Sequence, residues 1–214
     1  MNMYNMEKQH KLGKLHALER ICLLLDEDSF REIGSNITNL EDAFNIKKGQ
    51  FPYDGVITGY GTIEGNLVYV YSQDASVLGG SMGEMHAKKI CNIYSMAMKM
   101  GAPVIGLVDC AGLRLQEATD ALNAFGSFYY KQAMASGVIP QITAVFGNCG
   151  GGLAAAAALS DFTFMAENGK LFVNSPNTIP GNTADKCDTA SAKFQSEESG
   201  IVDGVGSEEE ILGE

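Results

Sequence analysis

Two glycine-rich turns, each directly after an apolar run, constrain the fold of this chain more than any other feature. Residues 103–108 run into the turn around Gly112, and residues 140–146 run into the glycines at 150–152 and then an alanine-rich helix. Glycine lets the backbone approach a ligand closely, and a helix start offers N–H donors that lack intrahelical partners. Brought together, two such turns would form a hole for a developing oxyanion. The sequence therefore predicts chemistry done by backbone groups.

Hydrophobic periodicity predicts strands and helices in alternation around these turns. Apolar residues at helical spacing predict helices over residues 14–26 and 119–135, and the glycines at 79–80 are expected to start a third. Two runs flanking residues 64–65 predict a β-hairpin. The polar residues 34–54 are expected to form a loop across the surface. The alternation predicts an α/β architecture with apolar, two-sided strands.

Length and composition narrow the class of protein. A chain of 214 residues suits one domain better than two, and we expect a helical lead-in over residues 1–33 followed by the domain proper over 34–214. A net charge of −11 with no basic stretch argues against a general nucleic-acid binder. The five cysteines are widely spaced and form no CxxC pair, so neither a metal site nor a disulfide framework is expected.

The hydropathy and the N-terminal residues predict neither a membrane span nor a secretory signal. No apolar run is long enough to span a membrane, and the N-terminus is too polar for a secretory signal. A reduced, cytoplasmic setting is the expectation for a chain with an odd number of unpaired cysteines.

Five blocks of sequence resemble the biotin-dependent acyl-CoA carboxyltransferases, in the same order along the chain. These blocks are residues 14–21, 54–61, 71–81, 135–141 and 158–164. The resemblance covers nearly the whole chain and implies the crotonase-like spiral of ββα units. The family includes propionyl-CoA and acetyl-CoA carboxylase subunits and the glutaconyl-CoA and methylmalonyl-CoA decarboxylases. Most members contain two such domains, and this chain resembles the N-terminal one alone.

The resemblance implies a subunit or domain that moves a carboxyl group between biotin and an acyl-CoA. In the family this half binds the acyl-CoA, and the second half of a neighbouring subunit holds the biotin. We therefore expect two partners, a second carboxyltransferase domain or subunit and a biotin carboxyl carrier protein, in a homo- or hetero-oligomer without which the chain is inactive. A decarboxylase of the family would lie at the periphery of a membrane complex. The acyl group, the direction of transfer and a split or truncated origin stay open.

The same resemblance assigns the chemistry to backbone amides. The N–H groups of Gly151 and Gly152 would hold the thioester oxygen of an enolate, with Gly112 and Leu113 lining the opposite side. Losing one such donor typically lowers the rate by a factor of ~10²–10³. The substrate proton is expected to pass to a biotin nitrogen, so neither a catalytic histidine nor a catalytic carboxylate is required, and no metal is expected. Cys110 and Cys149 beside the turns are assigned no chemistry.

Two positions depart from the family pattern. The first turn usually reads Gly-Gly-Ala-Arg, and here it reads Ala111, Gly112, Leu113 and Arg114. Because Leu113 fills space that alanine leaves, the acyl pocket is expected to differ. In the second turn Gly150 replaces the usual alanine, which loosens the loop without removing its donors.

Several residues are candidates for contact with CoA, and each has a structural alternative. The candidates are Gly150, Ala111, Arg114, Gly79, Gly80 and Ser81. The N–H groups of residues 79–81 could bind the pyrophosphate or simply cap a helix. Arg114 could contact a phosphate or form a surface or interface salt bridge.

Neighbouring charged residues are interpreted as structural. Gln116 and Glu117 are expected to brace the helix that follows them. Lys88 and Lys89 are expected to lie on a solvated helix face rather than to bind phosphate.

Two other functions compete with carboxyl transfer. A crotonase-fold hydratase or isomerase would carry a glutamate in the helix after the second turn and another after a later proline, but residues 153–158 and 175–177 contain no carboxylate. General acid–base hydration is therefore disfavoured. A non-catalytic CoA-binding subunit is the other alternative, and the retained glycine turns argue against it.

Overall fold

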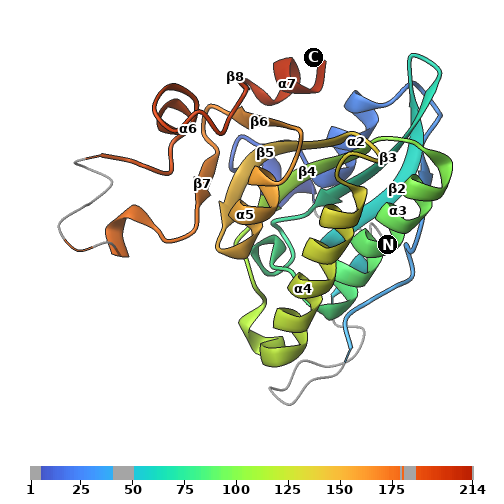
Figure 1. Ribbon diagram of the computed structural model, residues 1–214, viewed down its shortest axis with the longest axis horizontal. Coiled ribbons are helices and arrows are strands. Elements are labelled where there is room, and N and C mark those ends of the chain that lie inside the picture. Colours follow the sequence, from blue (N-terminus) through green and yellow to red (C-terminus); the bar gives the residue numbers. More distant parts are fainter. Residues whose placement is uncertain (1–5, 41–50, 179, 181–186, 214) are drawn as a thin grey trace.

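The computed structural model describes residues 6–40, 51–178, 180 and 187–213, in which strands and helices alternate along most of the chain (Figure 1). The helices are α1 (Met6–His10), α2 (Ala17–Leu24), α3 (Glu84–Met100), α4 (Ala118–Ala135), α5 (Gly152–Ala158), α6 (Ala192–Glu197) and α7 (Glu208–Gly213). The strands are β1 (Arg31–Glu32), β2 (Val56–Ile63), β3 (Asn66–Gln73), β4 (Val104–Cys110), β5 (Gln141–Gly150), β6 (Phe162–Ala166), β7 (Lys170–Phe172) and β8 (Gly204–Gly206). This confirms the predicted α/β class.

The strands form one mixed sheet in the order β1-β2-β3-β4-β5-β6-β8, with β7 pairing only β5. Strands β2 and β3 form the predicted hairpin, in which Ile63 faces Asn66 across the turn. From β3 to β8 the strands are parallel. The first half of β5 pairs with β6 and its end pairs with β7, so β7 takes the place of β6 along β5 beside the second glycine turn.

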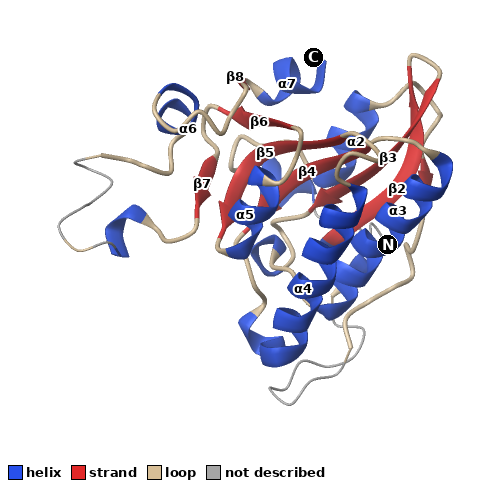
Figure 2. Cartoon of the chain, viewed as in Figure 1, coloured by secondary structure: helices blue, strands red, loops and turns tan. Residues whose placement is uncertain are grey.

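Each central strand is buried on both faces. All seven residues of β4 are buried. Val104 and Val108 pack in the cluster that contains residues of α3, α4 and α5, whereas Ile105 and Leu107 pack with residues of α2 and α7. Helices α3, α4 and α5 thus cover one face of the sheet, and α2 and α7 cover the other (Figure 2). This is the two-sided pattern expected of parallel strands.

Two helices begin later than predicted. Helix α2 begins at Ala17 because His16 caps it: a ring nitrogen of His16 accepts from the N–H of Leu18, and the Glu19 carboxylate accepts from the N–H of His16. Helix α3 begins at Glu84, so the prediction that residues 79–80 start it is wrong. Residues Leu78–Gly80 instead form a short 3₁₀ turn with left-handed backbone, which separates them from α3.

The expectation of a surface loop over residues 34–54 holds for most of residues 34–40, which form no helix or strand, but it is wrong at three buried positions. Asn39, Tyr53 and Asp54 are buried. Residues 41–50 lie outside the described residues. Buried polar groups need partners, and those of Asp54 prove to be central to the site.

The helical lead-in packs into the same body as the rest of the chain. The Arg20 guanidinium makes two hydrogen bonds to the Glu208 carboxylate, of 2.8 and 3.0 Å, which join α2 to α7. The boundary at residue 33 stays a prediction. None of the helices in the described ranges combines the length and the apolar character that a bilayer crossing requires.

Candidate functional site

The structure brings the two glycine turns into contact at the ends of β4 and β5. Cys110 and Cys149 are paired across these neighbouring strands. A Cβ atom on Gly112 would lie 3.0 Å from the carbonyl oxygen of Gly150, and one on Gly150 would lie 3.0 Å from the carbonyl oxygen of Ala111. The backbones therefore approach closely, and a Cβ at either position would press on its neighbour; at Gly112 a φ of 111° favours glycine as well.

In the second turn, only one of the two expected N–H donors is available. The N–H of Gly151 already donates to the carbonyl oxygen of Phe172 at 2.9 Å, which continues the β5–β7 ladder. Gly152 is the first residue of α5, and its N–H has no acceptor among the described residues. Gly151 has φ 63° and ψ −131°, a conformation that favours glycine. Gly151 thus shapes the turn while Gly152 presents its donor.

Two aromatic residues of α4 pack against Gly152. The Tyr129 hydroxyl donates to the Gly152 carbonyl oxygen at 2.6 Å. A Cβ atom on Gly152 would lie 2.5 Å from the Tyr129 hydroxyl oxygen and 3.2 Å from the Phe125 ring. A side chain at this position would displace the contacts that fix the turn.

The first turn is fastened to Met82 on both sides of Leu113. The N–H of Met82 donates to the Gly112 carbonyl oxygen at 2.9 Å, and the N–H of Arg114 donates to the Met82 carbonyl oxygen at 3.0 Å. Leu113 lies between these bonds, half-buried, and in the described part of the chain its own N–H has no acceptor. The N–H groups of Leu113 and Gly152 are therefore unpaired donors in adjoining turns of the described chain.

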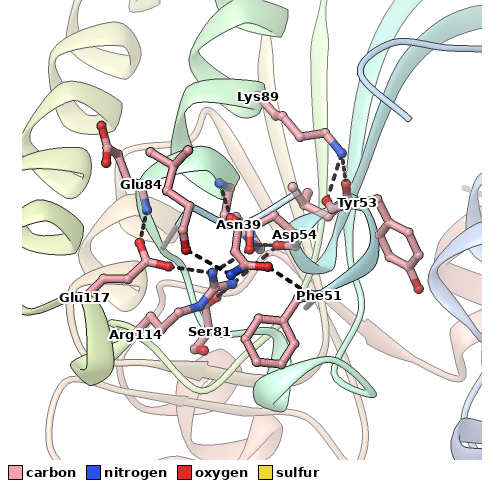
Figure 3. A network of polar contacts seen from close by, with 12 residues as sticks. Asn39, Phe51, Tyr53, Asp54, Ser81, Glu84, Lys89, Arg114 and Glu117 are labelled. Atoms are coloured by element: carbon pink, nitrogen blue, oxygen red, sulfur yellow. Dashed lines mark hydrogen bonds and ion pairs between the residues drawn. The ribbon is translucent and has the colours of Figure 1, made fainter. Parts of the chain in front are cut away.

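The side chain of Arg114 is fully buried in a polar network (Figure 3). Its Nη1 donates to Asp54 Oδ1 at 2.5 Å and to Glu117 Oε1 at 2.8 Å, and its Nη2 donates to the Ser81 carbonyl oxygen at 2.8 Å. The ring of Phe51 lies 5.9 Å from the guanidinium carbon. Arg114 has no surface from which to reach a phosphate, so its position does not support contact with CoA, and its salt bridges are internal.

Asp54 occupies an unusual backbone segment. Tyr53 and Asp54 have φ values of 42° and 48°, and Gly55 follows with 71°. This left-handed run costs conformational energy at the two non-glycine positions. It directs Asp54 Oδ1 to Arg114 and lets Oδ2 accept from the N–H of His86 at 2.7 Å. Burial raises the pKa of the Asp54 carboxyl and the Arg114 guanidinium opposes that rise, so the ion pair depends on both partners.

Glu117 caps α3 rather than bracing the helix that follows it. Its Oε2 accepts from the N–H of Glu84, the first residue of α3, at 2.5 Å. At the start of α4, no side-chain cap is made by Glu117. A Cβ on Gly83 would collide with both the Glu117 carboxylate and Arg114. The expectation that Glu117 braces α4 is therefore wrong. Its carboxylate binds the start of the preceding helix α3 instead.

The residues at 79–81 support the first turn from its other side. The N–H of Ala111 donates to the Gly79 carbonyl oxygen at 2.9 Å. The N–H groups of Gly80 and Ser81 already donate to the carbonyl oxygens of Val77 and Leu78. These two amides are not available to a pyrophosphate in this structure, and neither residue caps α3.

The two lysines of α3 differ from each other. Lys88 is exposed and pairs with Glu84 at 2.5 Å, as a solvated face predicts. Lys89 is buried, and its Nζ donates to the carbonyl oxygens of Tyr53 and Val56. Burial lowers the pKa of Lys89 to about 8. The expectation of a solvated Lys89 is therefore wrong, since its ammonium ties α3 to the left-handed segment.

The cysteine thiols beside the two turns and the nearby His86 imidazole are neutral. Burial raises the pKa of the Cys110 thiol to about 12 and raises that of Cys149 well above its ordinary value. Burial also lowers the pKa of His86, whose Nδ1 faces the Asp54 carbonyl oxygen at 2.9 Å. Across the described ranges, no three His, Cys, Asp or Glu side chains gather as a metal site would require. The arrangement can hold an oxyanion through backbone N–H groups, with no thiolate or imidazolium beside it.

Sequence reasoning missed the residues that position the turns. Asp54, Met82, Tyr129 and Phe172 each contact a turn from another element. Asp54 lies inside one of the five family blocks, where a lone aspartate before glycine is the only local signal. The partners of the other three depend on strand order and helix packing, which the sequence alone does not specify.

Comparisons with known proteins agree with this geometry. The family model for the carboxyl transferase domain matches residues 8–211. Methylmalonyl-CoA decarboxylase subunit alpha of Propionigenium modestum is 45% identical over 181 residues, which cover 84% of this chain and 35% of that protein. The propionyl-CoA carboxylase beta chain of Roseobacter denitrificans is 48% identical over 174 residues, covering 81% and 34%. The chain thus spans about a third of the length of the curated relatives it matches.

Solved structures show the same fold. The structure of transcarboxylase 12S, described as a hexamer with methylmalonyl-coenzyme A and methylmalonic acid bound, matches with a TM-score of 0.91 at 35% identity, covering 97% of this chain and 41% of that chain. A chain of a Pseudomonas malonate decarboxylase hetero-tetramer matches with a TM-score of 0.79 at 22% identity, covering 93% and 81%, and shows the fold alone. The predicted crotonase-like fold in a single domain is confirmed.

Proposed function

Since this chain belongs to the biotin-dependent carboxyltransferase family, we propose that it forms the acyl-CoA half of a carboxyltransferase site. The observation that carries the proposal is the contact between the two turns, which leaves the N–H groups of Leu113 and Gly152 unpaired at adjoining positions. Such donors stabilise charge that develops on a thioester oxygen when the neighbouring carbon becomes a carbanion. The absence of side chains at Gly112, Gly150 and Gly151 would let the two turns approach each other closely.

The residues of this chain bind and polarise the substrate. Leu113 and Gly152 would each donate one hydrogen bond to the thioester oxygen and stabilise the enolate, while Ala111 and Gly150 line the contact between the turns. When bound, biotin on a carrier protein would supply or accept the carboxyl group, and the substrate proton would pass to a biotin nitrogen. No protein carboxylate or thiol is needed as a base, which fits the raised pKa of both thiols beside the turns.

The partners are part of the proposal. A second carboxyltransferase domain or subunit would complete the site, a biotin carboxyl carrier protein would deliver the carboxyl group, and the assembly would be a homo- or hetero-oligomer. The support is the share of each relative that this chain spans, and the relatives' own descriptions as subunits or chains. The free state of all five cysteines supports the reduced, cytoplasmic setting that is proposed with it.

Decarboxylation is the second candidate. The match to a methylmalonyl-CoA decarboxylase subunit is as extensive as the match to propionyl-CoA carboxylase. The enolate and its stabilisation are common to both directions, so the same two N–H groups would serve either. The direction would be set by the partners that the chain works with.

Binding of acyl-CoA by the purified chain tests the proposal. Thermal unfolding is followed with free CoA and with acetyl-, propionyl-, methylmalonyl- and glutaconyl-CoA, in the wild type and in Gly152→Ala. Gly126→Ala is the matched control, because Gly126 lies in α4 with open space around its Cβ position. We expect a concentration-dependent rise in Tm with one thioester class, kept in Gly126→Ala and reduced in Gly152→Ala. A folded wild-type chain that no thioester stabilises would contradict the acyl-CoA half-site.

A further inference from the structure

The position of the Leu113 N–H depends on residues that are distant in the sequence. It lies between two backbone hydrogen bonds to Met82, and the residue after it is Arg114. The peptide group between Leu113 and Arg114 adjoins the one that carries the Leu113 N–H, so a displacement of Arg114 is passed to that donor through the Leu113 Cα. What holds Arg114 therefore controls the geometry of the first turn.

The Arg114 guanidinium is held by four oxygen atoms from three separate segments. Asp54 contributes a carboxylate oxygen at 2.5 Å and its carbonyl oxygen at 3.3 Å, Ser81 contributes a carbonyl oxygen at 2.8 Å, and Glu117 contributes a carboxylate oxygen at 2.8 Å. Figure 3 shows these groups converging on the guanidinium from opposite sides. A planar guanidinium with fixed donors is locked in orientation by such a set, more firmly than a lysine ammonium would be.

Each carboxylate is itself held by a backbone N–H at the start of α3. Asp54 Oδ2 accepts from His86, and Glu117 Oε2 accepts from Glu84. Both side chains are thus wedged between Arg114 and the first turn of a 17-residue helix, where negative charge is favourable. The left-handed backbone at Tyr53 and Asp54 is needed to reach this position, which marks the segment as more than a connection.

We propose that Asp54 and Glu117 are positioning residues for the oxyanion hole, which act by fixing Arg114 so that the Leu113 N–H points at the thioester oxygen. This inference rests on the proposed function and names residues that act on the same site from outside it. Neither carboxylate touches the substrate. Their effect reaches the reaction through the direction and rigidity of one backbone donor.

Two NMR readouts separate this role from general stabilisation. The first is the order parameter of the Leu113 amide in the free protein, which reports how rigidly the donor is held. The second is the ¹³C shift of the thioester carbonyl of [1-¹³C]propionyl-CoA bound to the protein, which moves downfield as hydrogen bonds polarise the carbonyl. Amides in the middle of β4 serve as an internal reference, since a merely loosened core would affect them as well.

The variants are Asp54→Asn and Glu117→Gln, with Asp26→Asn as the matched control. Asp26 also accepts from backbone N–H groups, those of Glu64 and Gly65, but it does so at the tip of the β2–β3 hairpin. We expect the Leu113 order parameter to fall from about 0.85 toward 0.6 or lower in both test variants and to stay unchanged in the control. The bound carbonyl should lose most of its downfield displacement in the test variants only.

If Asp54→Asn does not fold, Glu117→Gln and the double variant Asp54→Asn/Arg114→Met decide the question. This double variant removes the Asp54–Arg114 ion pair, and Glu117 keeps its hydrogen bond from the N–H of Glu84, so the protein should fold without the anchor and the Leu113 amide should stay mobile. A Leu113 amide as rigid as the wild type in the folded test variants would overturn the positioning role. A wild-type protein with a rigid Leu113 amide but no carbonyl displacement would instead overturn the oxyanion hole itself.

Discussion

The two glycine turns present the same kind of donor but are held in place by different physics. The first turn is fixed by a buried cation between two carboxylates, at the end of a segment with left-handed backbone. The second is fixed by a strand ladder through Phe172 and by the neutral side chains of Tyr129 and Phe125. One backbone N–H is thus aimed by electrostatics and the other by packing, so the two halves of one hole should respond differently to charge, pH and volume.

Removing the cation from the first turn is expected to have the largest effect. Arg114→Met leaves Asp54 and Glu117 buried beside each other with no positive partner, and breaking a buried ion pair in this way costs ~3–5 kcal/mol. Urea unfolding of the variant and the wild type measures the difference. A loss no larger than that of an average surface substitution would mean that water or another cation replaces the guanidinium.

A methyl group in the second turn should cost less stability but should impair the site. Gly152→Ala places a Cβ 2.5 Å from the Tyr129 hydroxyl oxygen and 3.2 Å from the Phe125 ring. Overpacking of this kind costs ~1–3 kcal/mol. Denaturation combined with acyl-CoA binding checks both effects, with Gly126→Ala as the control. Unchanged binding despite lost stability would show that the turn can shift without losing its donor.

The surroundings of the first turn should make stability depend on pH. Burial lowers the pKa of Lys89 from 10.5 to about 8, so between these values the unfolded chain keeps a proton that the folded chain has released. Stability must then rise with pH, by about 2 kcal/mol between pH 7.5 and 9.5. Denaturant titrations at both pH values should show this rise in the wild type and not in Lys89→Met. An equal rise in the variant would assign the effect to another group.

The smallest expected effect is loss of a single hydrogen bond in the second turn. Tyr129→Phe removes the hydroxyl that donates to the Gly152 carbonyl oxygen while keeping the aromatic ring, and such a bond contributes about 1 kcal/mol. Because no charge is involved, the loss should be the same at pH 6 and pH 9. A pH-dependent loss would contradict the division between a charged first turn and a neutral second turn.

The sequence predicted the parts of the fold that local pattern determines. The hairpin around residues 64–65, the helix over 119–135 and the buried strands that precede the turns were all predicted from periodicity and turn residues. The helix starts were less well predicted. The start of α2 depends on a histidine cap, and the start of α3 depends on backbone that turns left-handed at Gly79 and Gly80.

The sequence predicted the two turns of the candidate site but not the residues that hold them in place. The turns and the glycines that allow their contact follow from the sequence, and the wider interpretation follows from the family resemblance. The N–H of Gly151 donates to the carbonyl oxygen of Phe172 because β7 pairs with β5. Local sequence pattern does not reveal that pairing. The salt bridge considered for Arg114 is present but buried, and Lys89 is buried as well, because long-range partners enclose charged residues that a sequence places on the surface by default.

The salt bridge between Asp54 and Arg114 joins positions 60 residues apart, which has a consequence for folding kinetics. Closing so long a loop before other contacts exist has a large entropic cost, whereas the hairpin and α3, which lie between the two residues, form from nearby residues. The first turn therefore acquires its final geometry only after the hairpin, α3 and β4 have assembled. During synthesis, a ribosome must release both turns and the start of α5 before the half-site can form, so the hairpin, α3 and β4 are available to assemble before the site is.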